Sequence, residues 1–489
     1  MYMRRATTGR RSASVVDGGT GLPLRWRGRV LTVLFFFPRG GSAQVARAFA
    51  GALPAAGWQT ALVAGSLGRP GEETNAGSFF SGLEVHPVDY SPALESLDPL
   101  AALLPFQPSY EDRPGAPDRV FATVDDAAYE RLVGAWSETL GRAAAGEAAD
   151  LLHVHHLTPA NEAAIRCFPS LPILGQLHGT ELAFLRTVEA GPPAGWRYAA
   201  RWAERMRGWA QQCELVIVPP GAEAEAALLL GLERGRLRSL PGGVDPARFT
   251  RRPLAQTDRF AFWRRWLVDE PRGWDMSGRP GSVAYDGQDI APFQTGAPVL
   301  LYVGRFTAVK RLPLLVAAHA RASERLGTPA PLVLVGGYPG EWEGEHPLAA
   351  AARLGNQHVF LAGWRAHELL PQALNAADLL VLPSVGEAFG LVLVEAMACG
   401  LPVVACASHG PAAIVADGKT GWLVPPDGVD ALADALFAAA SDREERRARG
   451  ERAYAESGRY AWPAIAPRLA SLYEELLVPT QERAARAGR

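Results

Sequence analysis

The sequence predicts an α/β protein made of two doubly wound domains, each built around a parallel sheet. Short apolar runs alternate with helical stretches, this alternation occurs twice, and a segment of different composition separates the two halves. Strands that alternate with helices are typical of parallel sheets with helices on their faces. A chain of 489 residues, 48% of them hydrophobic, is long enough for two or three domains.

In the first half, VLTVLFFF (30–37) is apolar except for Thr32, precedes Pro38 and fits a strand that is buried on both faces. A glycine turn then opens a helix within 40–57. The remaining strands of this half are expected at 59–65, 151–156, 171–179 and 215–221.

The second half repeats the pattern, with a helix expected at 310–327 after its first strand. Its strands are expected at 298–305, 331–337, 358–364, 377–384 and 402–408. The segment 460–477 reads as a helix with an apolar stripe through Ile465, Leu469, Leu472 and Leu476.

These patterns predict the division of the chain. Seven of the first 29 residues are Arg and no apolar stretch follows them, so a disordered arm is expected rather than a signal peptide. The alternative for the arm is electrostatic contact with an anionic membrane surface. The expected parts are a basic arm (1–28), an N-terminal domain (29–245), a linker or insertion (246–297), a C-terminal domain (298–460), a C-terminal helix that crosses back to the N-terminal domain (461–480) and a tail (481–489).

Bulk composition limits the classes of function. The net charge of −2 gives no general attraction to nucleic acid, so no nucleic-acid partner is expected. No run of 18 apolar residues occurs, so no membrane-spanning helix is expected. The cysteines form no CxxC pair and are expected to be buried free thiols of a cytoplasmic protein: Cys167, Cys213, Cys399 and Cys406.

Ligands of open α/β sheets bind beyond the carboxyl ends of the strands. Gly40 and Gly41 follow the first strand at the start of a helix, where backbone N–H groups favour an anion, although paired glycines also make ordinary turns. His178 lies at the end of another strand and could donate to a sugar hydroxyl or a phosphate, or be structural. Arg305 and Lys310 follow Gly304 at a third strand end, where an anion between them would balance two cations that could otherwise be solvated surface groups.

Glu387 and Glu395 lie eight residues apart in the apolar stretch VGEAFGLVLVEAMACGLP (385–402). Glutamate is rarely buried without a partner. On one helix these residues would be separated by about 12 Å, which matches the spacing of the hexose and the ribose in a nucleotide sugar. The hypothesis is that sugar hydroxyls, and in part Arg305 or Lys310, are their partners. A favourable position at a helix N-terminus is the alternative for Glu387.

These motifs resemble the retaining GT-B glycosyltransferases of family 4, the group 1 glycosyl transferases. The resemblance is dense from about 298 to 477 and continuous but looser from 30 to 250. It implies two facing Rossmann-like doubly wound domains with a deep cleft between them. The stretches that carry it are RGGSAQVARAFAGAL (39–53), PGGVDPARF (241–249), GRFTAVKR (304–311), GEAFGLVLVEAMACGLPVVA (386–405) and DGKTGWLVPPDGVDALADAL (417–436).

The resemblance also implies roles for the candidate residues. Arg305 and Lys310 would neutralise the diphosphate leaving group, Glu387 would contact the donor hexose, and Glu395 would contact the ribose. His178 would face the donor sugar. The other donor contacts would come from Gly40, Gly41, Gly304, Gly336, Gly337, Trp364, Arg365, Phe389, Gly390 and Leu391, the base lying near the glycine pair 336–337 and the turn 363–365.

The implied activity is transfer of a hexosyl unit from a nucleotide sugar, taken to be UDP-linked, to a hydroxyl acceptor with retention of configuration. The acceptor could be a sugar, a glycan, a lipid-linked glycan or a small molecule. The chain contains no Asp-x-Asp, so no metal and no cofactor are expected. Gly242 and Glu181 depart from the family pattern, which usually has Asn and Asp there.

Three alternatives remain open. Another GT-B enzyme, such as a sugar-nucleotide epimerase or a phosphorylase, would share the fold. A non-catalytic nucleotide-sugar-binding protein would not need both cations and both acids. A nicotinamide oxidoreductase would need the GxGxxG fingerprint, which the 38–42 turn lacks. The aromatic residues of 246–297 and the loop 106–120 are expected to face the acceptor, or else to pack over the domain junction.

Overall fold

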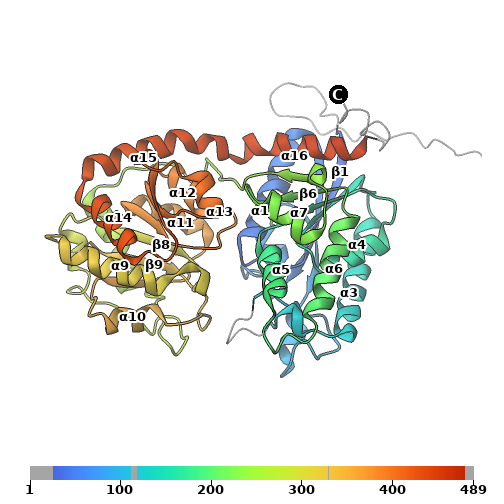
Figure 1. Cartoon of the computed structure of the whole chain (residues 1–489), viewed down its shortest axis with the longest axis horizontal. Helices are drawn as coiled ribbons and strands as arrows, with labels where there is room; N and C mark the ends of the chain where they lie inside the picture. Colours follow the sequence, from blue (N-terminus) through green and yellow to red (C-terminus); the bar gives the residue numbers. More distant parts are fainter. Residues whose placement is uncertain (1–25, 112–117, 329, 479–489) are drawn as a thin grey trace, which may run out of the picture.

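A computed structural model describes residues 26–111, 118–328 and 330–478. It has two lobes, each with a parallel sheet between helices, and a pair of helices that runs along the top of both (Figure 1). The basic arm lies outside the described residues except for its last few positions, as does the tail 481–489, so membrane contact through the arm stays a prediction. No helix in the described ranges is long and apolar enough to cross a membrane.

The sheet of the first lobe has the order β3-β2-β1-β4-β5-β6-β7, and its neighbouring strands pair in parallel. The predicted strands of this half are all present. β3 and β7 were not predicted, because β3 is an edge strand with exposed positions and β7 spans three residues. The strands are β1 (Gly28–Leu34), β2 (Trp58–Ser66), β3 (Glu84–Asp89), β4 (Leu151–His155), β5 (Ile173–Gln176), β6 (Leu215–Val218) and β7 (Leu237–Ser239).

Helices cover both faces of this sheet (Figure 1). The longest, α3, begins at an aspartate N-cap, because the Asp125 carboxylate accepts a hydrogen bond from the backbone N–H of Ala128. The helices are α1 (Gly41–Ala52), α2 (Ala76–Phe79), α3 (Asp126–Ala144), α4 (Pro159–Cys167), α5 (Thr180–Ala190), α6 (Ala199–Gln212) and α7 (Glu223–Leu230).

The sheet of the second lobe has the order β10-β9-β8-β11-β12-β13 and is also parallel. Its strands are β8 (Leu300–Gly304), β9 (Leu332–Gly336), β10 (Val359–Gly363), β11 (Leu379–Leu382), β12 (Val403–Cys406) and β13 (Gly421–Val424). Its helices are α9 (Leu312–Arg325), α10 (Pro347–Arg353), α11 (Leu370–Ala376), α12 (Leu391–Ala398), α13 (His409–Ile414) and α14 (Val429–Ser441).

In each sheet the strand order reverses beside the first strand of the lobe. β1 lies between β2 and β4, and β8 lies between β9 and β11. Such a switch point opens a crevice at the carboxyl ends of the strands. The loops after β1 and β8, which carry the glycine pair 40–41 and Arg305, therefore begin at the two crevices.

The segment 246–297 packs into the second lobe. It contains helix α8 (Gln256–Arg264), and the indoles of Trp263, Trp266 and Trp274 are buried in the core of this lobe. The expectation that these aromatic residues face an acceptor is wrong for the three tryptophans. Burial of a large apolar side chain stabilises the lobe, which explains why they turn inward.

The last two helices join the lobes. Helix α15 (Arg443–Ser457) lies along the second lobe, and α16 (Trp462–Leu477) continues along the first (Figure 1). The apolar stripe of α16 packs against residues of α1 and of the first sheet, including Phe49 and Trp58.

Cys213, Cys399 and Cys406 are buried and Cys167 is half-buried, and all four thiols are free.

Candidate functional site

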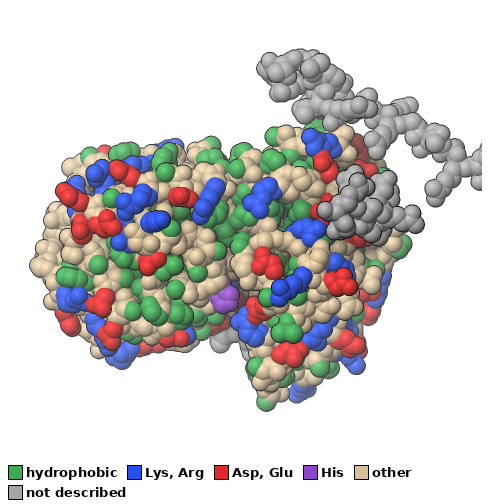
Figure 2. Space-filling view, turned by 45° about the horizontal axis from the view of Figure 1, so that its top comes forward, with side chains coloured by type: hydrophobic (Ala, Val, Ile, Leu, Met, Phe, Trp, Pro, Cys, Tyr) green, Lys and Arg blue, Asp and Glu red, His purple; other side chains and the backbone are tan. Residues whose placement is uncertain are grey.

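The loops at the two switch points line two adjoining cavities of about 720 Å³ and 640 Å³ between the lobes. From outside, the lobes are divided by a furrow, and acidic and basic side chains are mixed over the visible face (Figure 2). Residues from both lobes line each cavity. The residues that the two cavities share are Arg39, Gly40, Gly41, Val303, Gly304, Arg305, Leu391 and Val392.

The predicted charged residues meet in this cleft. Arg305 lies where the cavities join, Glu395 lines the larger cavity, and Glu387 lines the smaller one together with Lys310 and His178. Arg305 thus lies between the two predicted glutamates, with Glu395 in the wall of one cavity and Glu387 in the wall of the other. All five side chains come to one place although they belong to three different segments, which follow β5, β8 and β11.

Lys310 and Glu387 form an ion pair within the second lobe, and both side chains are largely buried. Glu387 is not in a helix, because α12 begins at Leu391 after Gly390, whose φ of 90° lies in the left-handed region. The prediction of one helix that holds both glutamates is therefore wrong. The 385–390 loop, not helical rise, positions Glu387.

Glu395 lies inside α12, and its side chain is 6% exposed. Its partner is His367, whose Nε2 lies 2.7 Å from the Glu395 Oε1 atom. His367 follows β10 in a short 3-10 turn, and its ring packs against Phe249. Sequence analysis missed His367, although a histidine four residues after a strand end was a usable signal.

The cations near the centre of the cleft contact the opposite lobe. Arg305 forms a two-pronged pair with Glu111 of the first lobe, with an Nη2–Oε1 distance of 3.1 Å. Arg39 of the first lobe pairs with Glu341 of the second. The loop 106–111 therefore reaches the cleft, while 112–117 lies outside the described residues, and a contact of this loop with an acceptor stays a prediction. Sequence analysis did not identify Glu111 as the partner of Arg305.

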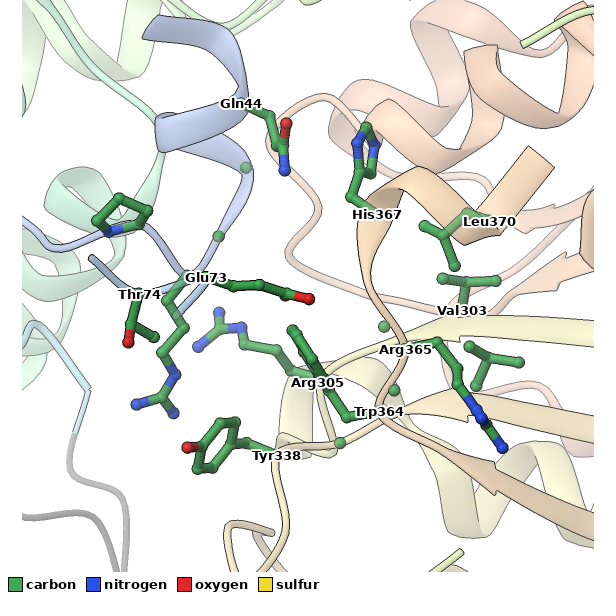
Figure 3. A pocket seen from close by; sticks show the side chains of 18 of the residues that line it. Gln44, Glu73, Thr74, Val303, Arg305, Tyr338, Trp364, Arg365, His367 and Leu370 are labelled. Carbon is green, nitrogen blue, oxygen red and sulfur yellow. The ribbon is translucent and has the colours of Figure 1, made fainter. Parts of the chain in front are cut away.

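A further acidic residue enters the larger cavity from the first lobe. Glu73 points into the cavity from the loop before α2, on the side opposite the second-lobe strands (Figure 3). Burial, and then the nearby Glu368 carboxylate, raise the pKa of Glu73, while Arg272 opposes this effect. No sequence motif marked this residue, because it lies in a loop without a strand-end pattern.

His178 is held on several sides. Its Nε2 lies 2.9 Å from Nδ1 of His155, and its backbone N–H donates to Glu181 over 3.1 Å. Burial lowers the pKa of His178 well below the ordinary value, and the neighbouring His156 and His153 lower it further. The imidazole is therefore neutral at physiological pH and lines the smaller cavity as a hydrogen-bonding group.

The turn after β10 contributes Trp364 and Arg365 to the larger cavity. The Arg365 guanidinium is directed away from the open part of the cavity (Figure 3). It donates to the carbonyl oxygens of Ala362, Trp266 and Glu270 over 2.8–3.1 Å, and burial lowers its pKa to about 10. The guanidinium is therefore already bonded to protein carbonyl oxygens, and a donor contact by this turn stays a prediction.

The glycines differ in what surrounds them. A Cβ atom on Gly336 would lie 2.3 Å from the carbonyl oxygen of Gly304, and one on Gly337 would meet the Phe306 ring at 2.7 Å. Both are required for the approach of β8 and β9, and both have positive φ angles. Nothing lies within 4 Å of a Cβ atom on Gly40, so a ligand could approach that backbone closely.

Two helix N-termini open onto the cleft. Helices α1 and α12 have glycine N-caps, neither has an acidic residue in its first turn, and the Leu391 side chain lies close to Gly41. The free N–H groups and helix dipoles favour an anion between them. Phe389, Gly390 and Leu391 line the smaller cavity beside Glu387. Within the described ranges, no three His, Cys, Asp or Glu side chains gather as a metal-ligand group.

Family comparison covers both lobes. Residues 39–248 match the model described as Glycosyltransferase Family 4, and residues 288–456 match the model described as Glycosyl transferases group 1. A curated relative, the D-inositol 3-phosphate glycosyltransferase of Kribbella flavida, is 38% identical over 193 residues, which are 36% of this chain and 43% of the relative. The chain spans about half the length of the curated relatives it matches.

Solved structures resemble nearly the whole chain. Sucrose-phosphate synthase from Thermosynechococcus elongatus superposes with a TM-score of 0.63 at 21% identity, over 92% of this chain and 99% of that one. HepE from Anabaena, in complex with UDP and glucose, has a TM-score of 0.61 at 18% identity, over 91% and 99% of the two chains. At these identities the likeness concerns the fold. Together with the two family models, it shows that the chain has the GT-B fold and belongs to the family 4, group 1 glycosyltransferases.

Proposed function

We propose that this protein transfers a hexosyl unit from a nucleoside diphosphate sugar to a hydroxyl acceptor, with retention of configuration and without a metal ion. The observation that carries this proposal is the place of Arg305 at the junction of two cavities, with Glu395 on one side and Glu387 on the other. A donor that lay across the junction would place its diphosphate beside Arg305. Its nucleoside would then lie on the Glu395 side and its hexose on the Glu387 side.

Charge that develops on a departing diphosphate needs stabilisation. Arg305, Lys310 and the N-termini of α1 and α12 are positioned around the junction before any ligand binds, and preorganised groups of this kind give the largest catalytic effects. These groups could take the place of a metal ion. In same-face transfer the leaving phosphate accepts the acceptor proton, so no separate base is required.

The names of similar proteins guide the choice of substrates. The curated relative is named D-inositol 3-phosphate glycosyltransferase, and HepE was solved with UDP and glucose. We take UDP-glucose as the first donor to test and an inositol phosphate as the first acceptor. The smaller cavity, with His178, Thr180 and Glu387 in its wall, offers polar groups that suit a polyhydroxylated ring.

The test is an assay of UDP release from UDP-glucose and related nucleotide sugars, with and without inositol phosphates and neutral polyols as acceptors. Acceptor-dependent UDP release that persists in EDTA, and a product whose anomeric proton has the configuration of the donor, support the proposal. Release without any acceptor indicates hydrolysis or another GT-B activity. Loss of turnover in EDTA, or an inverted product, contradicts the corresponding part of the proposal.

A further inference from the structure

A row of histidines runs through the first lobe behind the smaller cavity. His153 and His155 lie two residues apart on the same face of β4, and their rings stack with centroids 4.5 Å apart. The Tyr473 hydroxyl of α16 lies 2.8 Å from Nδ1 of His153. At the other end, Nδ1 of His155 lies 2.9 Å from Nε2 of His178, which lines the cavity.

The ring of His178 is held in one orientation. His156 has a φ of 69°, a strained conformation for a residue that is not glycine, and its ring centroid lies 4.5 Å from that of His178. The buried Glu181 carboxylate binds His156 Nδ1 through one oxygen, at 2.5 Å, and accepts from the His178 backbone N–H through the other. The ring therefore cannot turn freely to choose another partner.

The contact between His155 and His178 needs one donor and one acceptor, because both rings are neutral. If His178 donated from Nε2, His155 would carry its proton on Nε2. That nitrogen is buried, and no described residue offers it a hydrogen-bond partner. Buried N–H groups without a partner are rarer than acceptors without one. The arrangement in which His155 donates from Nδ1 to Nε2 of His178 is therefore favoured.

We propose that His155 is a positioning residue that keeps the proton of neutral His178 on Nδ1, so that His178 offers an N–H donor to a substrate hydroxyl in the smaller cavity. No described protein group occupies His178 Nδ1. The role in turnover rests on the proposed transferase function, whereas the position of the proton does not. A donor with a single orientation discriminates between hydroxyl arrangements of the sugar better than a ring that can either donate or accept.

The test is a nitrogen NMR spectrum of the histidine imidazoles in the ligand-free full-length protein, in which the His178 signals are assigned by their loss in His178→Gln. We expect the pattern of an Nδ1–H tautomer for His178. In His155→Leu, which removes the donor, the proton should move to Nε2, the position favoured by free imidazole side chains in water. In His155→Asn, whose amide nitrogen can take the place of Nδ1, the tautomer should stay as in the wild type.

Turnover gives a second measurement. We expect kcat/KM to fall about tenfold in His155→Leu and to return most of the way in His155→Asn, because one hydrogen bond is lost and then restored. A wild-type His178 with its proton on Nε2, or a tautomer unchanged in His155→Leu, overturns the inference, and the wild-type spectrum decides even if that variant does not fold. If the spectrum shows the expected tautomer but the protein turns over no nucleotide sugar, the inference about His155 holds and only the proposed function is contradicted.

Discussion

The His367 imidazole and the Glu395 carboxylate lie 2.7 Å apart in the wall of the larger cavity, one after β10 and the other within α12. The contact gives the buried Glu395 a partner from its own lobe before any ligand binds. A ribose that bound there would meet a carboxylate already oriented by a second group, which lowers the cost of ordering it.

Replacement of Glu395 by Gln should weaken donor binding more than the chemical step. The ribose is remote from the reacting bond, so its contacts contribute similarly to the ground state and the transition state. We expect the KM for the donor to rise about tenfold with a smaller change in kcat, measured by UDP release. The matched control is Glu324→Gln, on the exposed face of α9, which should behave as wild type. A fall in kcat without a change in KM would contradict a ribose contact.

Lys310 offers an internal comparison, because the only other lysine of the chain, Lys419, is exposed. Lys310→Ala removes the partner of Glu387 and a cation beside the proposed diphosphate. We expect kcat to fall by about 100- to 1,000-fold, the usual effect of losing one preorganised charge-stabilising group. Lys419→Ala should keep wild-type kinetics. Near-normal kcat in folded Lys310→Ala would exclude a role of this lysine in the chemical step.

Glu111→Gln should tighten UDP binding. In the ligand-free protein the Glu111 carboxylate pairs with Arg305 and so competes with a phosphate for this cation. The Arg305 side chain is 42% exposed, which weakens the pair through solvent screening, so calorimetry should show a modest decrease of about threefold in the Kd of UDP. Glu95→Gln, exposed on the same lobe, is the control. Weaker UDP binding in Glu111→Gln would mean that Glu111 positions Arg305 for the ligand.

The contact between α16 and the first lobe should be important for stability. Leu469 is fully buried there, and Leu469→Ala should lower the free energy of unfolding by about 2–5 kcal/mol through lost burial and the cavity left behind. Leu477, 40% exposed at the end of the same helix, is the matched control, and its replacement by Ala should change stability by no more than about 0.5 kcal/mol. Urea unfolding followed by circular dichroism measures both. If Leu469→Ala lowered the free energy of unfolding as little as Leu477→Ala does, α16 would contribute little to the stability of the first lobe.

The buried histidines should make stability depend on pH. Burial lowers the pKa of His153 from its ordinary value of 6.5 to about 3, so the unfolded chain binds a proton in this window that the folded chain does not. The stabilisation is complete above pH 6.5 and is lost as the pH falls from there toward 3. At pH 5 the loss from this one group is about 2 kcal/mol.

His153→Gln removes this titration and keeps a group that can bond to Tyr473. The variant should therefore lose less stability than the wild type between pH 7 and pH 5, by about 2 kcal/mol, in paired urea titrations. His86→Gln, at a partly exposed position of β3, is the control for the loss of a histidine outside the core. Parallel pH profiles for wild type and His153→Gln would show that His153 is protonated in the folded state.

Much of the fold could be predicted because its signals are local. Apolar runs such as 30–37 and 298–305 mark buried parallel strands, and these runs predicted the two sheets, whereas the strand order that creates the switch points came from the structure. The edge strands β3, β7 and β13 were missed, because β3 has exposed positions and β7 and β13 span only three and four residues. The tryptophans of 246–297 were misplaced for a related reason: an aromatic residue has the same local signature in a core as at a binding surface.

By itself, the sequence determined that two parallel sheets form and that Arg305, Lys310, Glu387 and Glu395 follow or flank strand ends, because strand and turn preferences depend on neighbours along the chain. Only the tertiary structure decided which groups face them. Glu111 reaches Arg305 from 194 residues away, and His367 rather than a basic residue meets Glu395. Such pairs depend on how the lobes and loops pack, and packing is settled by the sum of distant contacts that no short stretch of sequence contains.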